Sequence, residues 1–143
     1  MYKLVIIGYG SFPEGCKSAL SLITGRIDEI HVAEYEGEEH SFLEKLKALF
    51  REHRQMVFYA DVTGGLPQQL AFRMMMQEKV PEKHVIISGA SFQTLINICL
   101  LLFYEPSADV LFKLVEMKEK EGSHCFLFSG YHSGMARQEG GHE

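Results

Sequence analysis

The chain alternates short apolar runs with longer amphipathic stretches, and this alternation limits its fold more than any other feature of the sequence. The short runs are rich in β-branched and aromatic residues and have the length of buried strands. Strands are therefore expected at residues 3–7, 30–34, 56–60, 84–88 and 124–128. The longer stretches carry apolar residues at helical spacing or begin with proline or a capping residue. Helices are expected at residues 13–22, 41–53, 67–76, 92–103 and 108–119.

This order of elements predicts an α/β fold in which a mostly parallel sheet is covered by helices on both faces. Such a fold is a three-layer α-β-α sandwich. Right-handed crossovers between successive parallel strands give a four-stranded sheet with the order 2-1-3-4. In the helix at 41–53, Ser41 is expected to be the N-cap, because Glu44 follows three residues later and completes a capping box.

The length of 143 residues fits one domain. We expect residues 1–130 to form this α/β domain and the glycine-rich residues 131–143 to form a mobile tail. The longest apolar run, 95–103, is shorter than the roughly 20 residues that span a bilayer, and no signal peptide is visible. The sequence therefore predicts a cytoplasmic protein.

The charges, the cysteines and the histidines argue against a nucleic-acid partner, disulfides and a metal site. The net charge is −5 and the sequence has no basic stripe, so nucleic acid is not expected as a partner. Cys16, Cys99 and Cys125 are far apart, which is typical of reduced thiols rather than of disulfides or a zinc site. The seven histidines stand in no metal-binding spacing, so no metal site is expected.

In a parallel sheet, ligands bind beyond the carboxyl ends of the strands, and three loops are expected to meet there. They comprise residues 8–15, 61–67 and 88–92. The first loop, GYGSFPEG, lacks the third glycine of a dinucleotide fingerprint because Pro13 stands in its place. It also lacks the lysine and the serine or threonine of a P-loop. We therefore expect no nucleotide cofactor, and Gly8 and Gly10 taken alone could simply form a tight turn.

The second loop, DVTGGLP, places Asp61 at the end of a strand and two glycines before a helix that opens on proline. The glycines leave backbone N–H groups accessible at a helix N-terminus, which suits an anion. Asp61 taken alone could equally be an N-cap or a loop acid. Together, the two loops favour a site that handles phosphate.

These loops resemble those of the IIA component of the mannose/fructose class of the bacterial phosphoenolpyruvate-dependent sugar phosphotransferase system. That family carries a first loop of the form xHGxFAxGL, matched by residues 8–15, and a second of the form DxxGGSP, matched by residues 61–67. A further loop of the family, GxNLPML, is matched more loosely by residues 89–95. The resemblance covers about residues 2–130.

The resemblance implies a protein that takes a phosphoryl group from the carrier protein HPr onto a histidine and passes it to a IIB component during sugar uptake. Such a protein reaches the membrane only through the IIC/IID permease. Asp61 matches the aspartate that orients this histidine, since a carboxylate on one ring nitrogen leaves the other free as a nucleophile. The residues expected to bind the phosphate or the partner are Gly10, Ser11, Thr63, Gly64, Gly65 and Leu66.

The resemblance also implies a homodimer. The family has a fifth, antiparallel strand that is exchanged between two subunits, and residues 124–128 fall where that strand belongs. The hinge of the exchange is expected at residues 121–123, where a glycine permits a change of direction.

Tyr9 stands at the position of the phosphate-carrying histidine, so that Tyr9 and Asp61 form the expected catalytic pair. A phenol is neutral and weakly nucleophilic at pH 7. A phosphotyrosine is an ester and donates its phosphoryl group less readily than a phosphoimidazole does. Leu66 also stands where the family usually has serine or threonine. These two changes indicate either a degenerate member of the family or an engineered substitution at position 9.

Three hypotheses for the function remain open. The first is a IIA component that relays a phosphoryl group, and the second is a degenerate, non-phosphorylated IIA-like module with a regulatory or interaction role. The third, a flavodoxin-like protein that binds a small ligand, has less support. Histidines expected to be solvated surface residues, and not substitutes for the carrier, are His31, His40, His53, His84, His132 and His142.

Overall fold

The computed structural model describes residues 1–78 and 81–129. Its strands are β1 (Lys3–Tyr9), β2 (Ile30–Tyr35), β3 (Met56–Ala60), β4 (His84–Ser88) and β5 (Phe126–Ser129). Its helices are α1 (Phe12–Thr24), α2 (Glu39–Glu52), α3 (Leu66–Met75), α4 (Phe92–Tyr104) and α5 (Val110–Glu121), with a short 3-10 helix, η1, at Pro81–Lys83. The tail expected at 131–143, with His132 and His142, lies outside the described residues.

The strands form one sheet in the order β2-β1-β3-β4-β5. The predicted order 2-1-3-4 of the parallel strands is confirmed, and β3 and β4 have the predicted bounds. The fifth strand pairs antiparallel with β4, with Ile86 opposite Phe128, and it begins two residues later than expected. This pairing lies within one chain, so exchange of β5 between two subunits stays a prediction.

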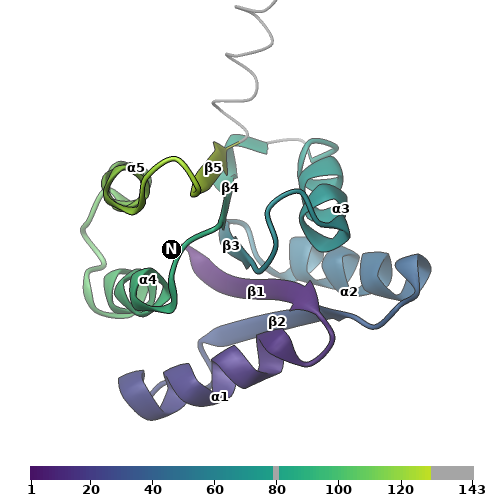
Figure 1. The fold of residues 1–143 in the computed structure, drawn as a ribbon, viewed down its shortest axis with the longest axis horizontal. Helices are drawn as coiled ribbons and strands as arrows, with labels where there is room; N and C mark the ends of the chain where they lie inside the picture. Colours follow the sequence, from purple (N-terminus) through teal and green to yellow (C-terminus); the bar gives the residue numbers. More distant parts are fainter. Residues whose placement is uncertain (79–80, 130–143) are drawn as a thin grey trace, which may run out of the picture.

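Helices cover both faces of the sheet, as predicted (Figure 1). On one face, Ile6 of β1 packs in a cluster with Leu20 of α1 and with residues of α4 and α5. On the other face, Ile7 packs with Phe42 of α2 and Leu70 of α3. All five side chains are fully buried, and each contributes about 1.5–3 kcal/mol to folding by leaving water. Consecutive residues of β1 thus face opposite cores, and the strand ends are left for the loops.

The start of α2 differs from the prediction. The N-cap is Glu38 rather than Ser41, and its carboxylate accepts the backbone N–H groups of His40 at 2.9 Å and of Ser41 at 2.7 Å. Because the longer glutamate side chain reaches both of these groups, the helix begins at Glu39 and Ser41 lies inside its first turn.

The prediction that the histidines are solvated is wrong for His84. This side chain is 3% exposed, its Nδ1 accepts the Met56 N–H at 3.2 Å, and burial lowers its pKa to about 4. The strand end that it occupies is covered by α2, whose Phe50 ring lies 4.9 Å from the imidazole. His31 and His53 are half-buried, with ring centroids 4.5 Å apart.

Among residues 1–78 and 81–129, no helix is long and apolar enough to cross a membrane. The same residues contain no cluster of three or more histidine, cysteine or acidic side chains that could hold a metal ion. Cys16, Cys99 and Cys125 are free and buried.

Candidate functional site

Tyr9 and Asp61 lie together at the carboxyl ends of the neighbouring strands β1 and β3. The Tyr9 backbone N–H donates to Asp61 Oδ2 at 2.8 Å, and the Val62 N–H donates to Asp61 Oδ1 at 2.8 Å. The carboxylate lies directly over Gly8, where an added Cβ would be 2.6 Å from Asp61 Cγ. A glycine at position 8 is therefore what allows the acid to approach the first loop so closely.

The side chain of Tyr9 points to the second loop. Its phenol oxygen accepts the backbone N–H of Leu66 at 2.9 Å, and a Cβ on Gly65 would lie 3.0 Å from it. Leu66 is the first residue of α3, so the phenol caps one of the N–H groups that a helix leaves unpaired at its N-terminus. The Tyr9 ring also packs edge-on against Tyr35 at 5.9 Å.

The second loop is held by a network of polar side chains. The Thr63 hydroxyl donates to Ser88 Oγ at 3.0 Å, and Gln68 Nε2 donates to the same oxygen at 3.1 Å. The other end of the Gln68 amide accepts the Gly64 N–H at 2.5 Å. Gly64 has φ +77°, a left-handed conformation that favours glycine. The loop is thereby fixed to the end of β4.

Not all the predicted residues belong to this contact network. Gly10, at φ +58°, donates its N–H to the Tyr35 carbonyl at 2.9 Å, and the Ser11 carbonyl accepts the Gly15 N–H at 3.0 Å. The described hydrogen bonds therefore tie Gly10 and Ser11 to β2 and α1, whereas Tyr9 contacts the second loop directly.

A glutamate and a histidine at the same edge of the sheet, Glu121 and His124, were not among the site residues predicted from the sequence. The Glu121 carboxylate accepts the Ser91 N–H at 3.1 Å, the Ser91 hydroxyl at 2.7 Å and the Thr94 hydroxyl. The hydrogen bonds from Thr94 and Ser91 lower the pKa of Glu121 to about 2. His124 Nε2 lies 3.1 Å from Glu121 Oε2.

The sequence signal for this pair is weak. α5 was expected to end at residue 119, but it extends to Glu121 and delivers the carboxylate to the N-terminus of α4. The sequence feature that could have indicated its position is the antiparallel direction expected for the last strand. An antiparallel strand begins at the edge where its parallel neighbours end.

Exposed apolar side chains occur at the ends of strands and helices, and in one loop, at this edge. Five of them are between 40% and 47% exposed: Tyr9, Phe12, Val62, Phe92 and Phe126. They come from the end of β1, the start of α1, the loop after β3, the start of α4 and the start of β5. Aromatic and aliphatic side chains exposed around a polar site are typical of a surface that docks another protein.

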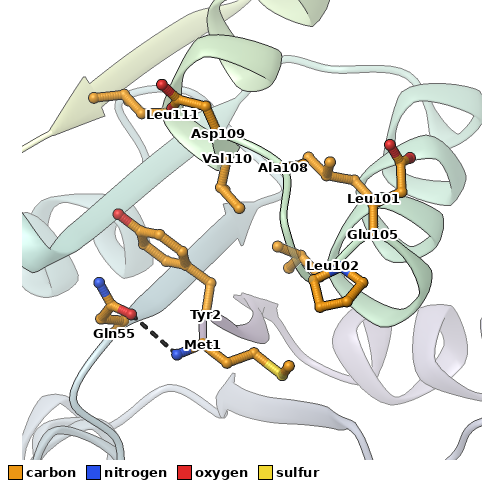
Figure 2. A pocket seen from close by; sticks show the side chains of 11 residues that line it. Met1, Tyr2, Gln55, Leu101, Leu102, Glu105, Ala108, Asp109, Val110 and Leu111 are labelled. Atoms are coloured by element: carbon orange, nitrogen blue, oxygen red, sulfur yellow. Dashed lines mark hydrogen bonds between the residues drawn. The ribbon is translucent and has the colours of Figure 1, made fainter.

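Two cavities lie near the ends of the sheet. A largely apolar groove of about 320 Å³ adjoins the second loop and is lined by Thr63, Gly64, Gln68, Gln69, Phe72, Phe126 and Phe128. A cavity of about 350 Å³ lies at the opposite, amino end of the sheet, where the Met1 ammonium donates to Gln55 Oε1 at 3.2 Å (Figure 2). None of the predicted site residues lines the second cavity, so it is separate from the site at the carboxyl edge.

No protein-family model and no curated protein matches the chain. Solved structures do match. The phosphotransferase system component EIIA from Streptococcus agalactiae is 23% identical, with a TM-score of 0.66 over 84% of this chain and 94% of the other. The PTS IIA protein associated with the fucose utilization operon of Streptococcus pneumoniae is 16% identical, with a TM-score of 0.62 over 83% and 90%.

A third structure is similar to the same extent. It is a protein assigned as a phosphoenolpyruvate-dependent sugar phosphotransferase system permease from Klebsiella pneumoniae, 16% identical, with a TM-score of 0.64 over 85% of this chain and 89% of the other. At these identities the likeness shows that the chain shares the fold of its neighbours: a five-stranded, mostly parallel sheet flanked by helices.

Proposed function

We propose that the chain is a IIA component of a sugar phosphotransferase system, of the mannose/fructose class, which relays a phosphoryl group from HPr to a IIB component. The observation that carries this proposal is the convergence of Asp61 and the α3 N-terminus on the residue at position 9. The fold shared with phosphotransferase system IIA proteins and the matched loops at 8–15 and 61–67 support it.

The arrangement around position 9 suits phosphoryl chemistry. A carboxylate lies on one side, where it can orient a ring and support a developing positive charge. On the other side, the Leu66 N–H at the start of α3 can donate to an anion, and the helix dipole favours negative charge there. A side chain at position 9 reaches this N–H, as the Tyr9 hydroxyl does at 2.9 Å.

A second candidate is a degenerate, non-phosphorylated IIA-like module with a regulatory or interaction role. The contact between Tyr9 and Leu66 favours it, because the phenol oxygen takes the N–H donor that a phosphate would use. In either case the expected partners are proteins, which dock on the exposed apolar side chains at this edge. The remaining expectations are a cytoplasmic homodimer that reaches the membrane only through the IIC/IID permease, without bound nucleic acid.

The test is labelling of position 9. Purified enzyme I, HPr and labelled phosphoenolpyruvate are incubated with a Tyr9→His variant and with the double variant Tyr9→His/Asp61→Asn. We expect Tyr9→His to carry label at position 9, located by mass spectrometry, and the double variant to carry less label there, because the added imidazole loses its carboxylate. An established IIA protein serves as the positive control. If that protein is labelled and Tyr9→His is not, the proposed function is wrong.

A further inference from the structure

His124 lies at the same edge of the sheet as Tyr9 and Asp61. β5 runs antiparallel to β4 and begins at Phe126, so the residues just before it lie where the parallel strands end. Gly89, which follows β4 at φ +75°, connects the two regions. A Cβ on Gly89 would be 2.1 Å from the His124 carbonyl oxygen and 3.1 Å from Thr63 Oγ1. Gly89 thus lies between the backbone carbonyl of His124 and the Thr63 side chain of the second loop.

The imidazole of His124 is held by a fixed carboxylate. Glu121 is anchored by the Ser91 N–H and by the Ser91 and Thr94 hydroxyls, and its side chain is only 11% exposed. An ionised carboxylate can only accept, so the nitrogen 3.1 Å away, His124 Nε2, carries the proton. The lone pair of the neutral ring is therefore on Nδ1.

The His124 side chain is exposed. Its exposed fraction is 62%, and the ring lies beside Gly122, where an added Cβ would be 3.6 Å from Nδ1. A protein that presents a phosphoryl group can approach this exposed side chain from solvent. The exposed Phe92 and Phe126 rings, which begin α4 and β5 at the same edge of the sheet, offer apolar contacts to such a protein.

We propose that His124 is the phosphoryl acceptor of this chain and that Glu121 is its positioning residue. This inference rests on the proposed function and identifies the residue that carries the group when position 9 holds a phenol. The carboxylate and the imidazole supply the arrangement that the family resemblance assigns to Asp61 and to the residue at position 9, with both partners present.

The transfer balances in atoms and charge. The donor is a phosphohistidine of a carrier protein, protonated on its second ring nitrogen. The lone pair on His124 Nδ1 forms a new N–P bond while the donor N–P bond breaks, and the donor leaves as a neutral imidazole. His124 becomes a phosphoimidazolium that keeps its Nε2 proton. The Glu121 carboxylate stabilises this positive charge at 3.1 Å, and passing the group onward restores the neutral ring.

The other described histidines lack this combination of exposure and a hydrogen-bonded carboxylate. His84 is buried. The rings of His31 and His53 pack against each other, and His53, whose side chain is 15% exposed, has the Glu52 carboxylate only at 3.8 Å. His40 is exposed and follows β2 at the same edge of the sheet, but its hydrogen bond to Glu38 is made by the backbone N–H and not by the ring. His40 is therefore the matched control: it is an exposed imidazole whose ring has no carboxylate partner among the described residues.

The experiment incubates enzyme I, HPr and labelled phosphoenolpyruvate with the wild-type chain and with His124→Gln, His124→Asn, Glu121→Gln and His40→Gln. Phosphohistidine is labile to acid and phosphotyrosine is not, and mass spectrometry locates the modified residue. We expect acid-labile label on the wild type and on His40→Gln, and loss of that label in both His124 variants. Circular dichroism of each variant confirms that it is folded.

The role of Glu121 has a separate readout. Nitrogen chemical shifts report which ring nitrogen of His124 carries the proton. We expect the Nε2–H form in the wild type and a mixture of both forms in Glu121→Gln, together with slower labelling. An unchanged tautomer in Glu121→Gln would overturn the positioning role.

Different labelling results would overturn His124 as the acceptor and the proposed IIA function. Label that persists in folded His124→Gln, or a wild-type chain that takes no label, overturns His124 as the acceptor. If Tyr9→His/His124→Gln is nevertheless labelled by HPr, the proposed IIA function stands without His124. If neither the wild type nor this double variant is labelled while an established IIA protein is, the proposed function fails as well.

Discussion

The phenol oxygen of Tyr9 accepts the backbone N–H of Leu66 at 2.9 Å, and thus caps α3 from the neighbouring loop. The contact joins the ends of two adjacent strands through residues far apart in the sequence. It also places a neutral oxygen where the proposed function would place a phosphate. If His124 accepts the phosphoryl group, as proposed, Tyr9 contributes to the structure of the site rather than to its chemistry.

The contribution of this cap is measurable. Tyr9→Phe keeps the ring against Tyr35 and removes the oxygen that Leu66 donates to. We expect a loss of about 0.5–1.5 kcal/mol in the free energy of unfolding, measured by urea denaturation, which is the usual value of one hydrogen bond. Tyr35→Phe is the control, because the described contacts of the Tyr35 side chain are ring contacts with Tyr9 and Phe42. Equal losses in the two variants would contradict the cap.

The approach of Asp61 to the first loop requires a glycine at position 8. Gly8→Ala places a Cβ 2.6 Å from Asp61 Cγ, so the carboxylate must move and its bond with the Tyr9 N–H is strained. We expect a loss of about 1–3 kcal/mol in stability, as for other overpacked positions. Gly15→Ala is the matched control, since its Cβ meets nothing within 4 Å and it lies in α1, where alanine gains up to about 1 kcal/mol. A Gly8→Ala protein as stable as the wild type would show that Asp61 is not held there.

Buried His84 makes the stability depend on pH. Its pKa is lowered from 6.5 to about 4 in the folded protein, so the unfolded chain binds the proton more readily. The stability is therefore full above about pH 6.5 and is lost as the pH falls from there to about 4, by up to roughly 3 kcal/mol. Urea denaturation at several pH values in this range measures the slope.

The variant His84→Asn separates the contribution of His84 to this pH dependence from that of other titrating groups. His84→Asn keeps an acceptor for the Met56 N–H without a group that titrates in this range. We expect its stability to be lower at pH 7 but to fall less steeply with acid. Parallel slopes for the two proteins would contradict the assignment to His84.

The proposed homodimer is tested by truncation. β5 lies at the edge of the sheet and carries the 43% exposed Phe126, an arrangement that invites pairing with a second chain. We expect light scattering to report a dimer for the intact chain, and monomers or aggregates for a chain that ends at Ser123, which keeps Glu121. An intact chain that is monomeric at micromolar concentration would refute the dimer. A truncated chain that remains dimeric would refute only the strand exchange.

The parts of the fold that the sequence predicts correctly are those set by local pattern. β3 and β4 are short apolar runs between clear breaks, and their bounds agree with the prediction to the residue. The order of the parallel strands follows from the handedness of the crossovers. The Glu38 cap was missed because a glutamate reaches farther than the serine that usually occupies such a position.

The site was predictable only in part. The loop motifs led to Tyr9 and Asp61, which the structure brings together by a hydrogen bond of 2.8 Å. The pair of Glu121 and His124 was not foreseen, because it depends on the end of α5 meeting the start of α4, thirty residues earlier in the chain. Contacts between elements so far apart have no local signature. The burial of His84 was missed for the same reason, since α2 covers it.

The proposal that the chain relays a phosphoryl group is tested by transfer of that group from HPr to a IIB protein. Phosphorylated HPr is mixed with a purified IIB protein, with and without catalytic amounts of the wild-type chain, and label on each protein is followed with time. If the chain is the relay, label moves from HPr to the IIB protein only when the chain is present. An established IIA protein is the positive control. If it transfers label to the same IIB protein and the chain leaves the label on HPr, the relay function is wrong.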